Sequence, residues 1–125
     1  MIVINFSHPL TEPQIARIEK LCGRVDQVVE VACQMDVNRP FDTQIVQLVD
    51  QVGLDSAQWQ ACQIAVGYPA LAAAALGVMA TLLGRCGYIP PAIRLRQQPG
   101  VVPPRYEVAE LIDLNVMRAE ARKQR

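Results

Sequence analysis

The chain has 125 residues, 51% of them hydrophobic and 5% aromatic, and its formal net charge at pH 7 is zero. This length suits a single domain, residues 1–125, with a core of aliphatic side chains, and the composition excludes a disordered chain. The balanced charge argues against a protein that coats nucleic acid, and we expect no DNA partner. Residues 85–105 differ, because they include four arginines and no acidic residue, which indicates an anionic ligand.

A strand followed by a helix is predicted at the start of the chain. Ile2–Ile4 is a short β-branched run, which is typical of a buried strand. The helix is predicted over Glu12–Cys22 and ends before Gly23. Thr11 can cap this helix, and Gln14 can complete a capping box.

The polar loop Asn5–Pro9 lies between this strand and this helix and contains His8, the only histidine. In an open α/β sheet, ligands bind at such junctions, where the helix presents unpaired N–H groups and a partial positive charge. The loop lacks the glycines of a dinucleotide-binding or P-loop motif. A ligand would therefore be held by Asn5, Ser7, His8 and backbone amides.

The next elements alternate between strands and helices. They are predicted as a strand at Val28–Cys33, a helix at Thr43–Val52 capped by Asp42, a turn or short helix at Leu54–Trp59, and a strand at Cys62–Val66. Gly67, Tyr68 and Pro69 then form a second junction between a strand and a helix. In a parallel sheet this junction lies at the same edge as the Asn5–Pro9 loop.

An alanine-rich helix is predicted over Ala70–Leu83, ending near Gly84–Gly87. It is too short for a membrane span, which needs about 20 apolar residues, so we expect a buried helix and no membrane association. The helix is apolar on nearly all sides, and only one side can cover the sheet. We therefore predict a homodimer through this helix, with burial inside a monomer as the alternative.

Further elements are predicted as a strand at Ala92–Arg96, a rigid loop at Gly100–Pro104 and a C-terminal helix at Asn115–Arg125. The segment Tyr106–Leu114 is ambiguous, because its apolar residues fit a helix better than the strict alternation of a strand. The order of elements predicts right-handed βαβ units. The expected fold is α/β: a small, Rossmann-like three-layer fold with a mostly parallel sheet of four or five strands.

The four cysteines are Cys22, Cys33, Cys62 and Cys86, and their spacing matches no metal-binding motif. We expect reduced, mostly buried thiols and neither a metal nor another cofactor. No signal peptide precedes the first strand, so we expect a cytoplasmic protein.

Three sets of residues are candidates for chemistry or for binding an anion: His8, the block Gly84–Tyr88, and the pair Arg94 and Arg96. His8 could act as a general base or contact a ligand, or it could be a hydrogen-bonding loop residue. Gly84–Tyr88 combines flexible backbone, the guanidinium of Arg85 and an aromatic ring, which suits phosphate contact and base stacking. A helix C-cap with a surface arginine explains this block equally well. Arg94 and Arg96 share one face of their strand, either as an anion patch or as part of a solvated edge strand.

Several segments, spread over nearly the whole chain, have counterparts in a known family. These segments are Asn5–Thr11, Trp59–Gln60, Gly84–Pro91, Ile93–Arg96, Pro103–Glu110 and Arg118. In these segments the chain resembles a family of small accessory proteins encoded beside type III CRISPR systems. The opening motif and the Gly-Arg-x-Gly-Tyr-x-Pro-Pro block are fairly specific. The chain departs from the family at Val66–Pro69, where a junction richer in proline and asparagine is expected. If this junction lines the site, we expect ligand specificity or catalytic ability to differ from that of the family.

The resemblance implies a Rossmann-like (CARF-like) domain related to sensors of cyclic oligoadenylates, which are usually dimers with the ligand at the two-fold axis. It also implies that the protein regulates type III CRISPR antiviral signalling, with cyclic tetra-adenylate as its ligand. The first expectation is sequestration of this second messenger. The alternatives are a metal-independent ring nuclease, with His8 and Arg85 as catalytic candidates, and an interaction subunit without a ligand.

Whether the protein is an enzyme, the size of the ring and any assembly beyond a dimer stay open. The expected ligand-binding residues are Asn5, Phe6, Ser7, His8, Pro9, Gly67, Tyr68, Gly84, Arg85, Gly87 and Tyr88.

Overall fold

The computed structural model describes residues 1–125. Its elements are, in chain order, β1 (Ile2–Asn5), α1 (Glu12–Cys22), β2 (Gln27–Glu30), α2 (Phe41–Asp50), α3 (Ser56–Ala61), β3 (Ile64–Gly67), α4 (Ala72–Cys86), β4 (Ala92–Gln97), β5 (Tyr106–Ile112) and α5 (Leu114–Arg122). The strands form one sheet in the order β2-β1-β3-β4-β5, in which only β5 pairs antiparallel with its neighbour. This arrangement confirms the predicted α/β, Rossmann-like fold with a mostly parallel sheet.

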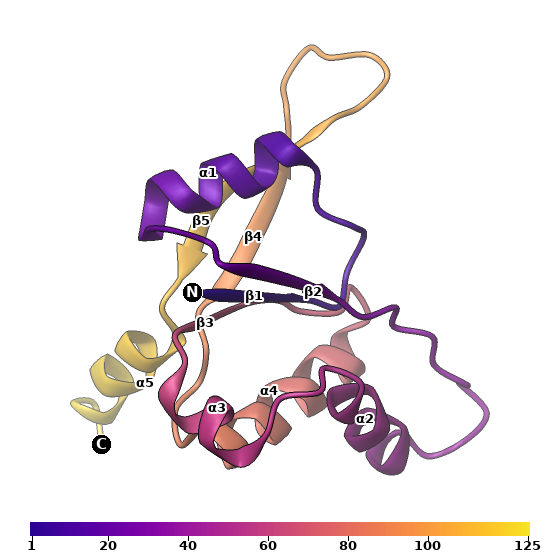
Figure 1. Ribbon diagram of the computed structural model, residues 1–125, viewed down its shortest axis with the longest axis vertical. Coiled ribbons are helices and arrows are strands. Elements are labelled where there is room, and N and C mark those ends of the chain that lie inside the picture. Colours follow the sequence, from indigo (N-terminus) through magenta and orange to yellow (C-terminus); the bar gives the residue numbers. More distant parts are fainter.

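Helices cover both faces of the sheet, which gives the three expected layers (Figure 1). Helix α1 packs on one face over a small cluster that includes Val3, Ile18 and Val108. Helices α2, α3 and α4 lie on the other face and enclose the larger core around Val66 and Trp59. Every residue of the central strands β1 and β3 is buried, so the carboxyl ends of these strands are held firmly by the core.

Local sequence signals set the ends of α1. The Thr11 hydroxyl accepts a hydrogen bond from the Gln14 N–H (3.4 Å), and the Gln14 side-chain oxygen accepts one from the Thr11 N–H (3.0 Å). This pair is the predicted capping box. Gly23, with a φ of 103°, follows the last turn. The predicted bounds of α1 are correct, because these signals need no contact with the rest of the fold.

Strand β2 and helix α2 differ from the prediction. β2 ends at Glu30, three residues early, and residues 31–40 form neither helix nor strand. The residues after Glu30 are apolar, so the sequence did not indicate that the strand ends there. The strand ends where the Glu30 carboxylate accepts hydrogen bonds from Asn5 and from the Leu10 N–H, in the loop after β1. The N-cap of α2 is Pro40, so Asp42 lies in the first turn instead of capping the helix. An acidic residue in the first turn is still favourable to the helix dipole.

The segment predicted as a turn or short helix is the helix α3, which Asp55 caps with Gln58 in a second capping box. Helix α4 continues to Cys86, beyond the predicted end at Leu83, and its C-cap is Gly87 with a φ of 79°. The left-handed conformation of this glycine, which other residues rarely adopt, marks the end of the helix.

The ambiguous segment Tyr106–Leu114 is mainly the edge strand β5. The register between β4 and β5 shifts at Arg94 and Leu95, which leaves β5 with one extra residue. As a result, Val108 and Leu111 both pack against the smaller core although they are three positions apart. This bulge explains why the segment lacks strict alternation.

Arg94 and Arg96 share one face of β4, as predicted, but each of them pairs with a glutamate of β5. The N···O distances are 2.7 Å for Arg94–Glu110 and 2.9 Å for Arg96–Glu107. These guanidinium groups are neutralised, so the pair forms no free anion patch. β4 is also not an edge strand, because β5 lies outside it.

Helix α4 has a buried and an exposed apolar side. Ala74, Val78 and Leu82 are buried against the sheet. Leu76, on the opposite side, is 64% exposed. The exposed apolar residues, which we name the α4 stripe, are Leu71, Ala72, Ala73, Leu76, Ala80 and Leu83. The alternative of burial on all sides within one chain is therefore wrong.

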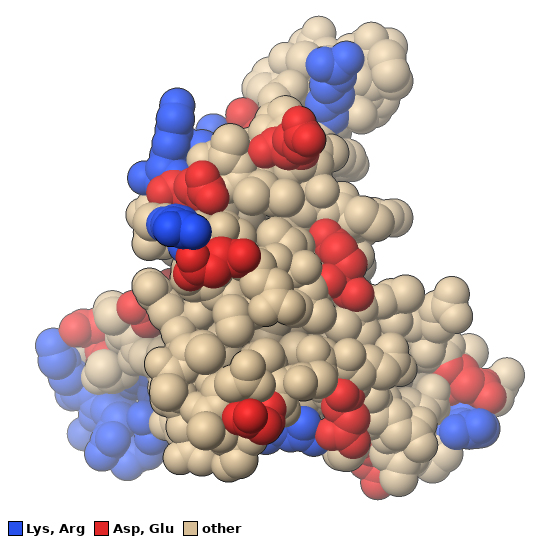
Figure 2. Space-filling view, viewed as in Figure 1, with Lys and Arg blue, Asp and Glu red and all other residues tan.

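Helix α5 has no buried residue and is attached by its first residues. The Asp113 carboxylate caps it, accepting hydrogen bonds from the Asn115 and Val116 N–H groups (3.0 Å each). The Asn115 carboxamide bonds both the N–H (2.9 Å) and the carbonyl (2.6 Å) of Ile89. Basic side chains gather at this end of the molecule, at the lower left of Figure 2.

All four cysteines are free thiols, and only Cys86 is buried, while the other three are half-buried. The expectation that most of the thiols are buried is therefore wrong. None of the helices combines the length and the apolar character that crossing a bilayer requires.

Candidate functional site

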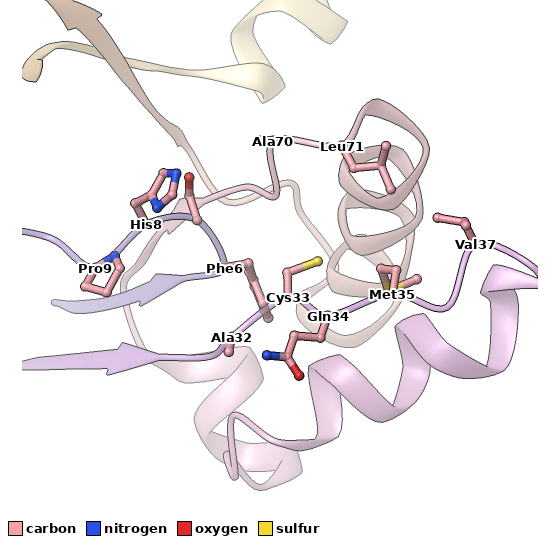
Figure 3. Close-up of a pocket in the computed structure, with 11 residues that line it drawn as sticks. Phe6, His8, Pro9, Ala32, Cys33, Gln34, Met35, Val37, Ala70 and Leu71 are labelled. Carbon is pink, nitrogen blue, oxygen red and sulfur yellow. The ribbon is translucent and has the colours of Figure 1, made fainter. Parts of the chain in front are cut away.

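A crevice of about 480 Å³ opens where the loops after β1 and β3 meet the irregular segment after β2 (Figure 3). Because β1 lies between β2 and β3 and all three are parallel, their carboxyl ends share one edge of the sheet. The lining residues are Phe6, Ser7, His8, Pro9, Ala32, Cys33, Gln34, Met35, Val37, Ala70 and Leu71. This is the edge at which the sequence predicted the ligand.

Asn5 fixes the shape of the loop that borders the crevice. Its side chain is 1% exposed, and its amide nitrogen donates to the His8 carbonyl and to the Glu30 carboxylate, at 2.7 Å each. Its amide oxygen accepts from the Ser7 N–H (3.2 Å), and the second oxygen of Glu30 accepts from the Leu10 N–H (3.0 Å). Asn5 was predicted to contact a ligand, whereas its hydrogen-bonding groups are already occupied within the chain.

Gly67 makes room for Asn5 on the neighbouring strand. The two residues are partners in the pairing of β1 with β3. A methyl group on Gly67 would overlap the amide oxygen of Asn5 and lie 3.2 Å from its side-chain carbon. Only glycine therefore fits here without displacing the side chain that organises the loop. Gly67 was predicted to contact the ligand, whereas in the structure it shapes the site by leaving room for the Asn5 side chain.

The predicted aromatic contacts are mostly buried in the core. Phe6 is almost inaccessible and belongs to the larger core, so only its edge reaches the crevice. The Tyr68 hydroxyl donates to the Pro90 carbonyl (3.0 Å) and borders a smaller cavity of about 140 Å³, which Ser7 also lines. Burial raises the pKa of Tyr68 above that of an ordinary tyrosine, so its hydroxyl stays a neutral donor even in mildly alkaline solution.

His8 is exposed at the crevice, as is Gln34, the other exposed polar residue that lines it. The His8 carbonyl is bonded to Asn5, but the His8 imidazole makes no hydrogen bond within the chain. Figure 3 shows His8 and Pro9 on one side of the crevice and Leu71 on the other. The ring nitrogens of His8 are therefore available to a ligand.

The N-terminus of α4 borders the same crevice as His8. Its N-cap is Leu71, which offers no side-chain oxygen, so the first N–H groups of this 15-residue helix have no side-chain cap. Leu71 and Ala70 also line the crevice. Uncapped N–H groups and the helix dipole favour an anion at this position.

The block Gly84–Tyr88 lies at the other end of α4. At 1.5 Å per residue, the 15 residues of the helix separate its two ends by roughly 21 Å. His8 and Arg85, the predicted catalytic pair, therefore do not meet within one chain. The Arg85 guanidinium instead donates to Asp50 (2.6 Å) and lies over the Trp59 ring (5.9 Å to the ring centre).

The remaining residues of this block have structural contacts as well. Gly87 is the C-cap of α4. The Tyr88 hydroxyl donates to the Cys62 carbonyl (3.3 Å), and burial raises its pKa. Gly84 and Arg85 border a separate hollow of about 380 Å³ beside Trp59. The structure thus divides the predicted ligand residues into two groups at opposite ends of α4.

Sequence reasoning missed Glu30 and the segment 32–37. The predicted strand Val28–Cys33 placed Glu30, Ala32 and Cys33 inside the sheet, and residues 34–37 were assigned to no element. One usable signal was the lone carboxylate of Glu30 beside apolar strand residues, because such a group near a sheet edge needs hydrogen-bond donors.

The arginines of residues 85–105 do not reach the crevice, whose lining contains neither arginine nor lysine. Three of the four are in ion pairs, and Arg105 is exposed in the loop between β4 and β5. No group of three or more His, Cys, Asp or Glu side chains is placed to hold a metal ion. Comparisons with family models, curated proteins and solved structures found no match.

Proposed function

We propose that the protein binds cyclic tetra-adenylate at the crevice beside β1 and β3 and sequesters it. The observation that carries the proposal is that the rigid loop of His8 and the uncapped N-terminus of α4 border the same opening. The identity of the ligand rests on the resemblance of the motifs to the type III CRISPR accessory family. Sequestration would lower the free concentration of this second messenger and so weaken the antiviral signal.

The phosphates of the ring would be held by the His8 imidazole, the Ser7 hydroxyl and the first N–H groups of α4. Helix N-termini bind anions through these donors and through the helix dipole. The loop of His8 is already fixed by Asn5 and Glu30, so ligand binding has little ordering entropy to overcome.

A second copy, packed on the α4 stripe, would complete the site. Leu71 belongs to both features, because it lines the crevice and begins the exposed side of α4. A two-fold axis parallel to α4 would bring both crevices to the same end of the dimer. A ring of four identical nucleotides can share that axis, so each copy would bind half of it.

We favour sequestration over cleavage because no acid or base in the chain pairs with the His8 imidazole. The nearest carboxylate in the network, Glu30, is occupied by Asn5 and by the Leu10 N–H. A ring nuclease that merely aligns a ribose 2′-hydroxyl with the adjacent phosphate needs no such pair. The first experiment therefore follows binding and cleavage together.

Radiolabelled cyclic tetra-adenylate is incubated with excess protein, and retained ring and linear products are measured in the same samples. We expect intact ring to be retained. His8→Ala should weaken binding by roughly tenfold, because it removes a hydrogen bond to a charged group. Arg85→Ala, at the far end of α4, should bind like the wild type. Linear products that disappear in His8→Ala would instead identify a nuclease, and neither retention nor cleavage at micromolar protein would indicate an interaction subunit.

The dimer is tested separately by Leu76→Glu, in the middle of the α4 stripe. We expect this variant to sediment as a monomer and to lose most ring binding, because a charge cannot be buried between two apolar helices. Val102→Glu is the matched control, since Val102 is 92% exposed in the loop between β4 and β5. A wild-type protein that sediments as a monomer with and without the ring contradicts the shared site.

A further inference from the structure

The interior of the crevice is apolar although its opening is polar. Seven of its 11 lining residues are hydrophobic, and none is a lysine or an arginine. Cys33 and Met35, in the irregular segment after β2, are half-buried and pack against the larger core. A phosphate placed among these side chains would lose its hydration without gaining a counter-charge, which is costly.

The polar groups, by contrast, lie around the opening: the His8 imidazole and the Ser7 hydroxyl on one side, the uncapped N–H groups of α4 beside Leu71 on the other, and the Gln34 carboxamide, which also lines the space. Figure 3 shows His8 and Pro9 on one side, Leu71 and Val37 on the other, and Phe6, Cys33 and Met35 between them. The space of about 480 Å³ lies within the range of roughly 300–1,000 Å³ that small-molecule sites occupy. An apolar interior beside an anion-binding opening suits a ligand with a flat, neutral part joined to a phosphate.

We infer that the interior of the crevice, formed by Phe6, Cys33 and Met35 with Val37 and Leu71 at its rim, seats one adenine base of the ring, while the phosphates stay at the opening. This inference rests on the proposed function, since adenine is the flat group of the proposed ligand. It assigns base recognition to the segment 32–37, which follows β2 and has no regular secondary structure. Each copy of a dimer would seat one base in this way.

Cys33 provides a direct report of occupancy. Its thiol lines the crevice, whereas Cys22 lies beside the cluster on the opposite face of the sheet. The rates of alkylation of both cysteines are measured by mass spectrometry, with and without cyclic tetra-adenylate. At a ring concentration that leaves less than about a tenth of the protein unbound, we expect alkylation of Cys33 to slow by about tenfold or more. The alkylation rate of Cys22 should not change. Cyclic tetra-uridylate, which has the same charge and smaller bases, should protect Cys33 less.

A pair of matched variants tests the assignment without disturbing the core. Val37 is 73% exposed at the opening, so Val37→Asp should fold normally while placing a carboxylate against the bound base. We expect it to weaken ring binding by about tenfold, through lost apolar contact and repulsion of the phosphates. Val102→Asp, the control, should bind like the wild type.

The outcomes separate this inference from the proposed function. Slower alkylation of Cys33 together with weak binding by Val37→Asp supports the base-binding site. If the ring is retained but neither Cys33 alkylation nor Val37→Asp binding changes, the bases lie elsewhere, and the inference is overturned while sequestration stands. If the ring is not bound at all, the proposed function fails, and the inference fails with it.

Discussion

Replacing Asn5 with alanine should destabilise the protein more than most single substitutions. The side chain makes three hydrogen bonds: two from its amide nitrogen, at 2.7 Å each, to the His8 carbonyl and the Glu30 carboxylate, and one that it accepts from the Ser7 N–H at 3.2 Å. A neutral hydrogen bond contributes about 1 kcal/mol and one to a charged group about 2 kcal/mol. Because Asn5 is buried, its partners would also lose their donor or acceptor at the sheet edge. We expect Asn5→Ala to lower the free energy of unfolding by about 3–5 kcal/mol.

Urea unfolding, followed by circular dichroism, measures this change directly. The midpoint should fall while the dependence on urea stays constant, as expected when native contacts alone are lost. Asn38→Ala is the matched control, because Asn38 is exposed and its side chain makes no hydrogen bond within the chain, and it should lie within about 0.5 kcal/mol of the wild type. A loss below about 1 kcal/mol in Asn5→Ala would refute the view that Asn5 organises the loop of His8.

Three further predictions concern stability. Gly67→Ala should cost about 1–3 kcal/mol in urea unfolding, because the added methyl group overlaps the Asn5 side chain, and a neutral result would contradict this packing. Arg85→Ala should cost about 1 kcal/mol by the same measurement, from the half-exposed ion pair with Asp50 and the contact with the Trp59 ring; an unchanged midpoint would argue against both contacts. Stability should fall as the pH rises above about 10, because the raised pKa of folded Tyr68 lets the unfolded chain ionise first, and Tyr68→Phe should reduce this slope in thermal unfolding.

The sequence predicted elements whose signals are local. The capping box of Thr11 and Gln14 fixed α1, and the β-branched run from Ile2 fixed β1, since neither depends on distant residues. The end of β2 was wrong because it depends on a tertiary contact between Glu30 and the loop after β1. β5 was ambiguous because a bulge, which depends on pairing with β4, removes the alternation that identifies a strand.

The candidate site was predicted in part for the same reason. The junction after β1 was located correctly, because parallel strands carry their loops to one edge of the sheet. Arg85 was grouped with His8 on chemical grounds, although α4 carries it to the opposite end of the sheet. Chemical type alone cannot place a side chain along a helix, whereas the rise per residue can, once the bounds of the helix are known.

The absence of arginine and lysine from the crevice leads to a last prediction, on the salt dependence of ring binding. When a protein neutralises phosphates with cationic side chains, affinity falls with salt, by a slope of about −0.7 per phosphate for single strands on a log–log scale. Four neutralised phosphates would therefore weaken binding by roughly several hundredfold over a tenfold rise in salt. Here the proposed phosphate donors are N–H groups, a hydroxyl and one imidazole, so we expect less than about a tenfold change between 50 and 500 mM salt. Equilibrium binding of labelled ring across this range provides the measurement. A steep slope that Arg105→Ala reduces would place the exposed arginine of a second copy at the phosphates, and would contradict a site built from backbone donors and His8.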